Sequence, residues 1–382
     1  MIIRGFYILT KMRNDDNRFM QMALFQASKG LGKVNPNPLV GAVIVRGNNI
    51  IGSGYHEQFG GPHAEINAIT NANGIVEGAT IYVTLEPCSH YGKTPPCADA
   101  LINAGIVKVV IAMTDPNPLV SGKGIERLKE NGIEVEVGVL EKEALELNRV
   151  FIKYIQTKLP YVVMKTAMSL DGKIATATGH SQWISSPESR QYVHGLRNEL
   201  KGIMVGVNTV ITDDPELTTR LNGETGRNPI RIVVDSKGRI PLSAKMLKDG
   251  ATNPVIVATT LGSPEEKRLF LEEAGHKVLI LAEHYGKVDL IQLMVELGKL
   301  GIDGILLEGG GTLNESALKS GIVDEIRFIL APLLLGGRDA ITPIEGTGFN
   351  TVDEGIRLYH MTTSRIGDDI LVTGRVIKTL ND

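Results

Sequence analysis

Apolar runs and mixed apolar–polar stretches alternate along the first half of the chain, and this alternation predicts strands and helices in turn. The runs Leu39 to Val45 and Ile50 to Tyr55 are separated by Gly47-Asn48-Asn49, which predicts a hairpin. The other predicted elements are helices at residues 16–30, 64–71 and 97–103 and strands at residues 80–85 and 107–112. This order predicts a mixed or parallel sheet covered by helices.

The pattern restarts after a polar-rich stretch, residues 142–158, that predicts a helix ended by Pro160. We place the domain boundary here, with one domain at residues 1–157 and a second α/β domain at residues 158–382. The predicted strands of the second domain are residues 161–167, 202–207, 230–235, 255–259, 278–281, 305–308, 325–330 and 370–376. Its predicted helices are residues 287–300 and a helix that begins at about residue 313.

Composition is that of an ordinary globular protein and narrows the classes of function. Of the 382 residues, 42% are hydrophobic and 22% are charged, which is enough to form two cores. The net charge of −3 and the aromatic content of 5% disfavour a nucleic-acid-binding surface. The apolar run Phe6 to Leu9 is too short to span a membrane, so we expect a cytoplasmic protein without a membrane partner.

The candidate chemistry centres on His63, Glu65, Cys88 and Cys97. One histidine and two cysteines can hold zinc and leave a fourth position for water, whose pKa zinc lowers to about 7. Glu65 can then carry the proton to a leaving amine. The order H-x-E, then P-C and a second cysteine, is typical of nucleobase deaminases, although eight residues separate the cysteines here.

Alternatives remain for these residues. Cys88 and Cys97 are the only cysteines and would form a disulfide in a secreted protein, but nothing in the sequence indicates secretion. In another alternative the three residues are unrelated, and His63 is a surface residue while both cysteines lie in the core. A purely structural zinc site would need a fourth ligand, and His90 is the one nearby candidate.

The chain resembles the bifunctional deaminase/reductase family of riboflavin biosynthesis from about residue 16 to its end. The first half carries the resemblance in Asn35-Pro36-Asn37-Pro38, Gly61-Pro62-His63-Ala64-Glu65 and the stretch from Thr84 to Cys97 with its Gly-Lys-Thr-Pro-Pro insert. The second half carries it in the stretch from Lys165 to Lys173, Ser181-Gln182-Trp183-Ile184, Asp213-Asp214-Pro215 and Glu308-Gly309-Gly310-Gly311.

This resemblance implies a cytidine-deaminase-like N-terminal domain and a dihydrofolate-reductase-like C-terminal α/β domain. It implies zinc-dependent deamination of a diaminopyrimidinone ribosylamino 5′-phosphate, followed by reduction of the ribosyl to a ribityl chain by NADPH. One zinc ion per chain, a phosphorylated pyrimidine as the partner and a homo-oligomer are expected. The residues alone do not distinguish NADPH from NADH.

The resemblance also implies roles for individual residues. Zinc would be held by His63, Cys88 and Cys97, with Glu65 as the proton shuttle. The pyrimidine and its sugar phosphate would meet Asn37, His56, Lys93, Asp115 and Asn117 in the first domain and Ser181, Arg197, Leu217, Arg220 and Glu308 in the second. The nicotinamide cofactor would meet Ala167, Trp183, Thr209, Asp213, Ser236, Gly310, Gly311, Thr312, Leu313, Asn314, Glu315 and Ser316.

The chemistry of these residue types supports the second domain's role. Glycines 309–311 lie between a predicted strand and a predicted helix, where backbone N–H groups can approach an anion. Lys165 interrupts an apolar strand and needs a partner, for which Asp213 and Glu308 are candidates. We predict that these three residues assist the reduction.

Two rival interpretations stay open at this stage. In one, the zinc site deaminates a nucleic-acid base, but the chain lacks the basic, aromatic-rich surface expected for that substrate. In the other, the C-terminal half is a non-catalytic nucleotide-binding or oligomerisation module, which Lys165 and the glycine loop disfavour.

Overall fold

The chain folds into two compact units, residues 1–157 and 158–382. The computed structural model describes residues 15–90, 95–118, 120–223 and 225–377, so the apolar run Phe6 to Leu9 and Lys93 lie outside the described residues. Within these ranges, none of the helices combines the length and the apolar character needed to cross a membrane.

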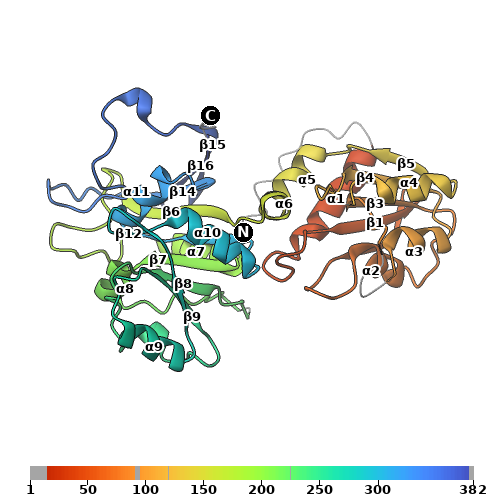
Figure 1. The fold of residues 1–382 in the computed structure, drawn as a ribbon. Coiled ribbons are helices and arrows are strands. Elements are labelled where there is room, and N and C mark those ends of the chain that lie inside the picture. The colour runs from red at the N-terminus through yellow and green to blue at the C-terminus, as the bar shows by residue number, and fades with distance from the viewer. Residues whose placement is uncertain (1–14, 91–94, 119, 224, 378–382) are drawn as a thin grey trace. The chain divides into compact units, whose positions relative to one another are not determined.

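The first unit is built on one five-stranded sheet in the order β2-β1-β3-β4-β5 (Figure 1). Strand β1 pairs antiparallel with β2 and β3, which includes the predicted hairpin, while β3, β4 and β5 pair in parallel. The strands are β1 (Gly41–Arg46), β2 (Asn49–Tyr55), β3 (Thr80–Leu85), β4 (Lys108–Met113) and β5 (Glu134–Val137).

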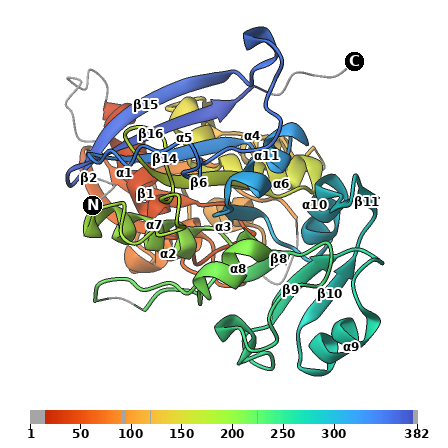
Figure 2. The ribbon, with the colours of Figure 1, turned by 90° about the vertical axis from the view of Figure 1, so that its left-hand side faces the viewer.

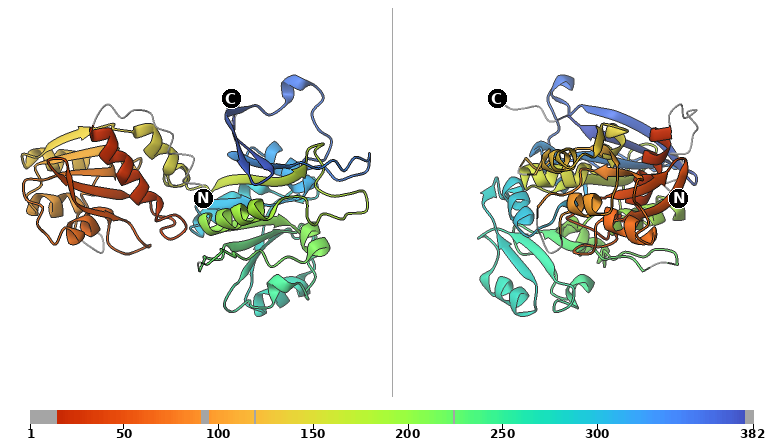
Figure 3. Two further views of the ribbon diagram at one scale, coloured as in Figure 1. Left: turned by 180° about the vertical axis from the view of Figure 1, so that it is seen from behind. Right: turned by 90° about the vertical axis from the view of Figure 1, so that its right-hand side faces the viewer.

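Helices cover both faces of this sheet and bury a separate core on each. Helix α1 covers one face of the sheet, as the left view of Figure 3 shows. It packs there through Phe19 and Met20, together with α5 and α6. On the other face α2, α3 and α4 pack through small and branched residues such as Ala68 and Leu101. The helices are α1 (Asp15–Ser28), α2 (Ala64–Asn71), α3 (Cys97–Asn103), α4 (Lys123–Glu130), α5 (Glu141–Leu147) and α6 (Arg149–Thr157).

The second unit is built on a nine-stranded sheet in the order β10-β9-β8-β7-β13-β6-β14-β16-β15 (Figure 2). Every pair from β10 to β14 is parallel, and β16 and β15 extend the sheet antiparallel. The strands are β6 (Tyr161–Ser169), β7 (Gly202–Gly206), β8 (Ile230–Val234), β9 (Val255–Thr259), β10 (Lys277–Ile280), β13 (Gly304–Leu307), β14 (Glu325–Ala331), β15 (Leu358–Ile366) and β16 (Asp369–Val376).

The core of the second unit lies where apolar residues of the parallel strands meet the helices. Met164, Met204 and Ile305 from three strands pack with Leu293 and Leu297 of α10. A small hairpin, β11 (Glu283–His284) with β12 (Lys287–Val288), precedes that helix. The helices are α7 (Pro187–Glu199), α8 (Val207–Asp213), α9 (Glu265–Glu273), α10 (Leu290–Lys299) and α11 (Gly311–Lys319).

Local pattern predicted the central elements well. Helices α2 and α3 and strands β3 and β9 have the predicted bounds, and the other predicted strands differ by a few residues at most. The predicted helix at residues 142–158 was wrong as a single element, because it is broken at Asn148. That side chain turns inward and bonds the backbone of Leu39, accepting from its N–H at 2.8 Å and donating to its carbonyl at 3.0 Å.

A second correction concerns residues 287–300. Lys287 and Val288 are a strand, and the helix begins only after Asp289, whose carboxylate accepts hydrogen bonds from the N–H groups of Ile291 and Gln292. Helices and strands that the sequence pattern did not predict are α4, β5, α7, α8, α9, β11 and β15.

We predict that Asn148→Ala lowers the free energy of unfolding of the first unit by about 2–4 kcal/mol, because two buried backbone groups of Leu39 lose their partner. Denaturant unfolding of the full chain measures this. Asn131→Ala, which removes an exposed bond to the Arg127 carbonyl, is the control and should cost about 0.5 kcal/mol or less. Equal losses for both variants would contradict the assignment.

Candidate functional site

Three metal-binding side chains converge in the first unit. His63 is the residue before α2, Cys88 follows β3, and Cys97 is the first residue of α3. Their ligand atoms all lie within 4.8 Å of one another, and His63 Nδ1 is 3.2 Å from the Cys97 sulfur and 3.7 Å from the Cys88 sulfur. The sequence predicted this set, and the structure brings it together.

The donor set fits zinc. Bond lengths of about 2.0 Å to nitrogen and 2.3 Å to sulfur place the ligands of one tetrahedral ion roughly 3.5–3.8 Å apart, close to the observed separations. His90, the candidate for a fourth ligand, is exposed and does not belong to the group formed by the described residues. Three protein ligands leave a position open, which is the arrangement of catalytic zinc sites.

The two sulfurs shift each other's pKa in opposite directions. A hydrogen bond with Cys97 lowers the pKa of Cys88 to about 4, and the bond to His63 acts in the same direction. The same bond to Cys88, together with burial, raises the pKa of Cys97. Zinc binds thiolates, so a zinc ion held here would favour the deprotonated form of both cysteines.

Glu65 lies beside these ligands, in the first turn of α2, and only 3% of it is exposed. Burial raises the pKa of its carboxyl to about 7, and the charge of His63 offsets this only in part. A carboxyl that titrates near neutral pH can take up a proton and release it again within one catalytic cycle.

Asn37 and His56, both expected to meet the substrate, are hydrogen-bonded to each other beside His63. His56 Nδ1 lies 3.0 Å from the Pro62 carbonyl, which can only accept, so this nitrogen carries the proton. The other ring nitrogen therefore accepts from the Asn37 amide at 3.1 Å. Burial lowers the pKa of His56, which favours this neutral form, and its ring meets that of His63 edge-on at 5.5 Å.

Asp115 and Asn117 lie in the loop that follows β4. The Asp115 carboxylate accepts a hydrogen bond from the backbone N–H of Asn117 at 2.8 Å. Burial raises the pKa of Asp115, while the charges of His90 and Cys88 also act on it, so this loop lies near the metal ligands. Lys93, the other expected phosphate contact, lies outside the described residues.

The second unit holds a charged cluster at the carboxyl end of its sheet. Arg197 of α7 binds both carboxylate oxygens of Glu308, at 2.8 and 3.0 Å, and Lys165 lies 3.9 Å from the same carboxylate. Burial alone would raise the pKa of Glu308, but the charges of Arg197 and Lys165 outweigh it and lower the pKa to about 2. Burial lowers the pKa of Lys165, against the effect of Glu308.

The predicted trio is thus brought together only in part. Lys165 and Glu308 form an ion pair, but among the described residues no hydrogen bond or ion pair joins Asp213 to them; Arg197 takes that place. Asp213 is the last residue of α8, and burial raises its pKa.

The residues expected to meet the cofactor follow the carboxyl ends of adjacent parallel strands. Ala167 lies near the end of β6, Thr209 lies in α8 after β7, Ser236 follows β8, and the glycines 309–311 follow β13. Because these four strands are neighbours in the sheet, the residues lie along one edge of it, where α/β sheets bind ligands.

Within the glycine loop the three residues have different reasons to be glycine. A Cβ at Gly309 would come within 2.9 Å of the Asn314 side chain, and one at Gly311 would meet the Glu345 side chain and the Thr342 carbonyl. Gly310, directly before α11, faces open space. Its backbone is thus accessible at a helix N-terminus, where anions bind.

Several expected contact residues have other partners in the structure. Asn314 is fully buried and donates to the carbonyls of Gly309 and Pro343, which holds the loop in place. Leu217 is 5% exposed and has a φ of 56°, an uncommon conformation for leucine. The Glu315 carboxylate pairs with Lys319 at 2.7 Å.

Trp183 is exposed on the surface of the second unit rather than buried in its core. Its exposed fraction is 68%, and the Arg190 guanidinium lies 4.6 Å from the centre of the ring. An exposed aromatic ring with a cation over it can serve as a platform for a flat ligand. Ser181, two residues earlier, is half-buried.

Two residues were missed by sequence reasoning. His194 of α7 accepts a hydrogen bond from the Arg220 backbone at 3.2 Å, and burial together with Arg197 and Arg220 lowers its pKa to about 4. Glu86, two residues before Cys88, accepts four backbone hydrogen bonds. Sequence reasoning assigned neither residue a role, because the groups that each one binds are distant in sequence.

Matches to protein families divide the chain in the same way as its fold. Residues 13–113 match the cytidine and deoxycytidylate deaminase zinc-binding region, and residues 160–372 match the RibD C-terminal domain. The class of protein is therefore a zinc deaminase domain of cytidine-deaminase-like fold joined to a reductase domain of dihydrofolate-reductase-like fold, as the sequence predicted.

Relatives match along nearly the whole chain. Riboflavin biosynthesis protein RibD of Actinobacillus pleuropneumoniae is 46% identical over 365 residues, 96% of this chain and 96% of that protein. The structure of Acinetobacter baumannii RibD, form 1, is 39% identical and matches with a TM-score of 0.85 over 95% of this chain and 99% of that one. A diaminohydroxyphosphoribosylaminopyrimidine deaminase/5-amino-6-(5-phosphoribosylamino)uracil reductase from Thermotoga maritima is 36% identical, with a TM-score of 0.82 over 95% and 99%.

The chain belongs to the RibD family of riboflavin biosynthesis proteins and is a bifunctional deaminase and reductase. This membership decides against the two rival interpretations, a nucleic-acid deaminase and a non-catalytic second domain.

Proposed function

We propose that this chain deaminates 2,5-diamino-6-(5-phosphoribosylamino)pyrimidin-4(3H)-one and then reduces the ribosyl to a ribityl chain, giving 5-amino-6-(5-phosphoribitylamino)uracil. One zinc ion per chain would serve the first step and NADPH the second. The observation that carries the proposal is the buried Glu65 carboxyl beside a three-ligand metal set, in a chain that also holds the Lys165–Glu308–Arg197 cluster.

The first site supplies the groups that hydrolytic deamination needs. Zinc, held by His63, Cys88 and Cys97, would activate water for attack on the pyrimidine. Glu65 would protonate the ring nitrogen and pass a proton to the leaving amine, a role that its pKa near 7 suits. Asn37, held by His56, would orient the ring, and Asp115 and Asn117 would bind the sugar phosphate along with Lys93.

The second site supplies positive charge and an anion-binding loop. The two positive charges of Lys165 and Arg197 exceed the single negative charge of Glu308, so the cluster attracts a phosphorylated substrate. Lys165 can give a proton as the sugar ring opens, because burial lowers its pKa. The open side of Gly310 supports pyrophosphate binding at the start of α11. The remaining residues expected to meet cofactor and substrate, Asp213 among them, stay predictions.

Glu65→Gln should lower the deamination rate by about 10²- to 10⁴-fold, because the amide cannot carry the proton. The measurement is NADPH oxidation with the aminated pyrimidinone phosphate as the sole substrate and zinc present. In this variant the signal should disappear, yet return when the deaminated intermediate is supplied. Full activity of Glu65→Gln on the aminated substrate would contradict a catalytic metal site.

Lys165→Ala should abolish NADPH oxidation with the deaminated intermediate and leave ammonia release unchanged, because the cluster loses its proton donor and leaves Glu308 paired with Arg197 alone. Lys201→Ala is a matched control, since this partly buried lysine bonds the Gly301 carbonyl instead. Normal NADPH turnover by Lys165→Ala would exclude Lys165 from the reduction.

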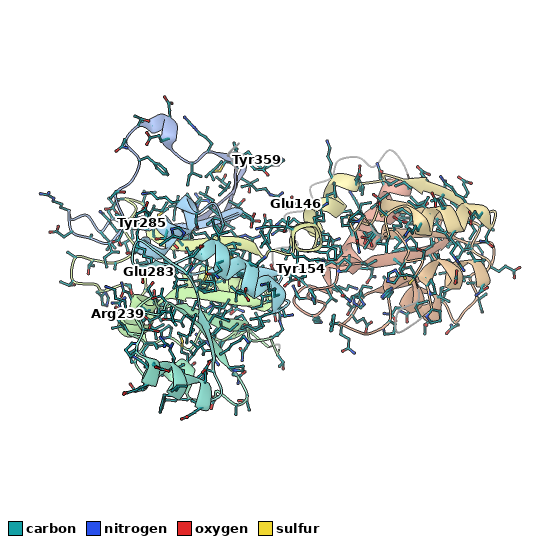
Figure 4. All side chains as sticks on the ribbon, in the orientation of Figure 1. Glu146, Tyr154, Arg239, Glu283, Tyr285 and Tyr359 are labelled. Carbon is teal, nitrogen blue, oxygen red and sulfur yellow. The ribbon has the colours of Figure 1, made fainter. Side chains whose placement is uncertain are left out.

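We also propose that the chain forms a homo-oligomer through β15. This strand is the edge of the nine-stranded sheet, nine residues long and exposed along nearly its whole length, and such edges pair readily with another chain. Tyr359, labelled in Figure 4, is 44% exposed on it, and Met361 is 51% exposed.

Tyr359→Lys places a charge on this edge and should shift the mass measured by light scattering toward that of a single chain of 41.3 kDa. Val352→Lys, at an exposed position outside the strand, should leave the mass unchanged. A wild-type mass of one chain, or an unchanged mass in Tyr359→Lys, would rule out this interface.

A cytoplasmic location belongs to the same proposal. Cys88 and Cys97 are both free, and a reducing compartment keeps such thiols available for metal.

A further inference from the structure

Glu86 is a buried carboxylate that the proposed chemistry does not use. It directly follows β3, is 5% exposed, and forms no ion pair with a cation among the described residues. Instead it accepts four backbone hydrogen bonds. One oxygen binds the N–H groups of Asp115 at 3.1 Å and Gly122 at 3.0 Å, and the other binds those of Gly124 at 2.9 Å and Ile125 at 3.3 Å.

These bonds join two loops that leave neighbouring parallel strands. Glu86 belongs to the loop after β3 that carries Cys88, and all four donors belong to the segment between β4 and the first turn of α4. The start of α4 also packs directly on the Cys88 loop, since a Cβ at Gly124 would collide with the Pro87 carbonyl oxygen. Glu86 therefore fixes Asp115 and the start of α4, residues 122–125, against the metal-binding loop.

The same segment carries Asp115, whose carboxylate is close enough to Cys88 and His90 for their charges to affect it. The N–H of Asp115 itself is one of the four donors to Glu86. The Glu86 carboxylate therefore sets the position of Asp115 relative to the metal ligands. Charge-assisted bonds to several backbone groups hold a loop more firmly than neutral ones.

We propose that Glu86 is a positioning residue of the deaminase site, which holds Asp115 and Gly122 at the distance from Cys88 that substrate binding requires. The inference rests on the proposed deamination. It assigns to Glu86 an effect on substrate binding, through the loop, and none on proton transfer or on metal binding.

The variant Glu86→Gln of the full chain tests this positioning role. A carboxamide offers one acceptor oxygen, and its NH₂ group faces N–H donors, so half of the bonds are lost. We expect KM for the aminated pyrimidinone phosphate to rise about tenfold or more, with kcat changed less than about threefold. Zinc content and the rate of reduction of the deaminated intermediate should equal those of the wild type.

Gly124→Ala is an independent second variant. It keeps the carboxylate but forces α4 away from Pro87, and it should raise KM in the same way. Glu126→Gln is the matched control, because it removes an exposed charge from the same turn of α4 and should change no parameter. Faster amide exchange at Gly122 and Ile125 in Glu86→Gln would report the loosened loop directly.

The possible results distinguish a failure of this inference from a failure of the proposed deamination. Unchanged KM in Glu86→Gln and Gly124→Ala overturns the inference, as does loss of zinc or a fall in kcat at constant KM. A parallel loss of deamination and reduction in both variants would mean that Glu86 only stabilises the fold, which also overturns it. A wild-type chain that releases no ammonia would instead refute the proposed deamination.

Discussion

Parallel pairing of neighbouring strands is the constraint on which both sites depend. Parallel strands need a crossover between them, so their carboxyl ends meet at one edge of the sheet and helices begin there. In the first unit this brings Cys88, after β3, beside the loop that follows β4. In the second unit the register pairs Met164 of β6 with Leu307, the last residue of β13, so the residues that follow them in the chain are Lys165 and Glu308. The Lys165–Glu308 ion pair is thus a direct consequence of sheet register.

Two buried glutamates show how the surroundings assign opposite roles to one residue type. Among the described residues, His63 is the only positive charge that acts on Glu65, and burial outweighs it and raises the pKa of Glu65 to about 7, which suits a carrier of protons. Glu308 is also buried, but Arg197 and Lys165 outweigh the cost of burial and lower its pKa to about 2. Glu308 therefore stays ionised at neutral pH and serves to hold and orient the two cations around it.

The sequence was sufficient where a local pattern determines structure. Helix α2, strand β3 and helix α3 follow from periodicity and proline placement, and the metal ligands follow because they sit at the ends of these elements. The sequence was insufficient where a partner that is distant along the chain determines the local structure. Asn148 breaks a helix to bond Leu39, 109 residues away. Strand β15 escaped prediction because both of its faces are exposed, which removes the alternation that marks a strand.

The same distinction separates the groups that react from the groups that position them. Residue type and spacing reveal His63, Glu65 and Cys88, because their chemistry is specific to them. Glu86 and Arg197 act through geometry: one accepts backbone N–H groups up to 39 residues away, and the other binds a carboxylate 111 residues away. The sequence around each residue does not reveal these contacts, because the partner lies far away along the chain. Two separate cores support these two sets, so each site is positioned by the packing of its own unit.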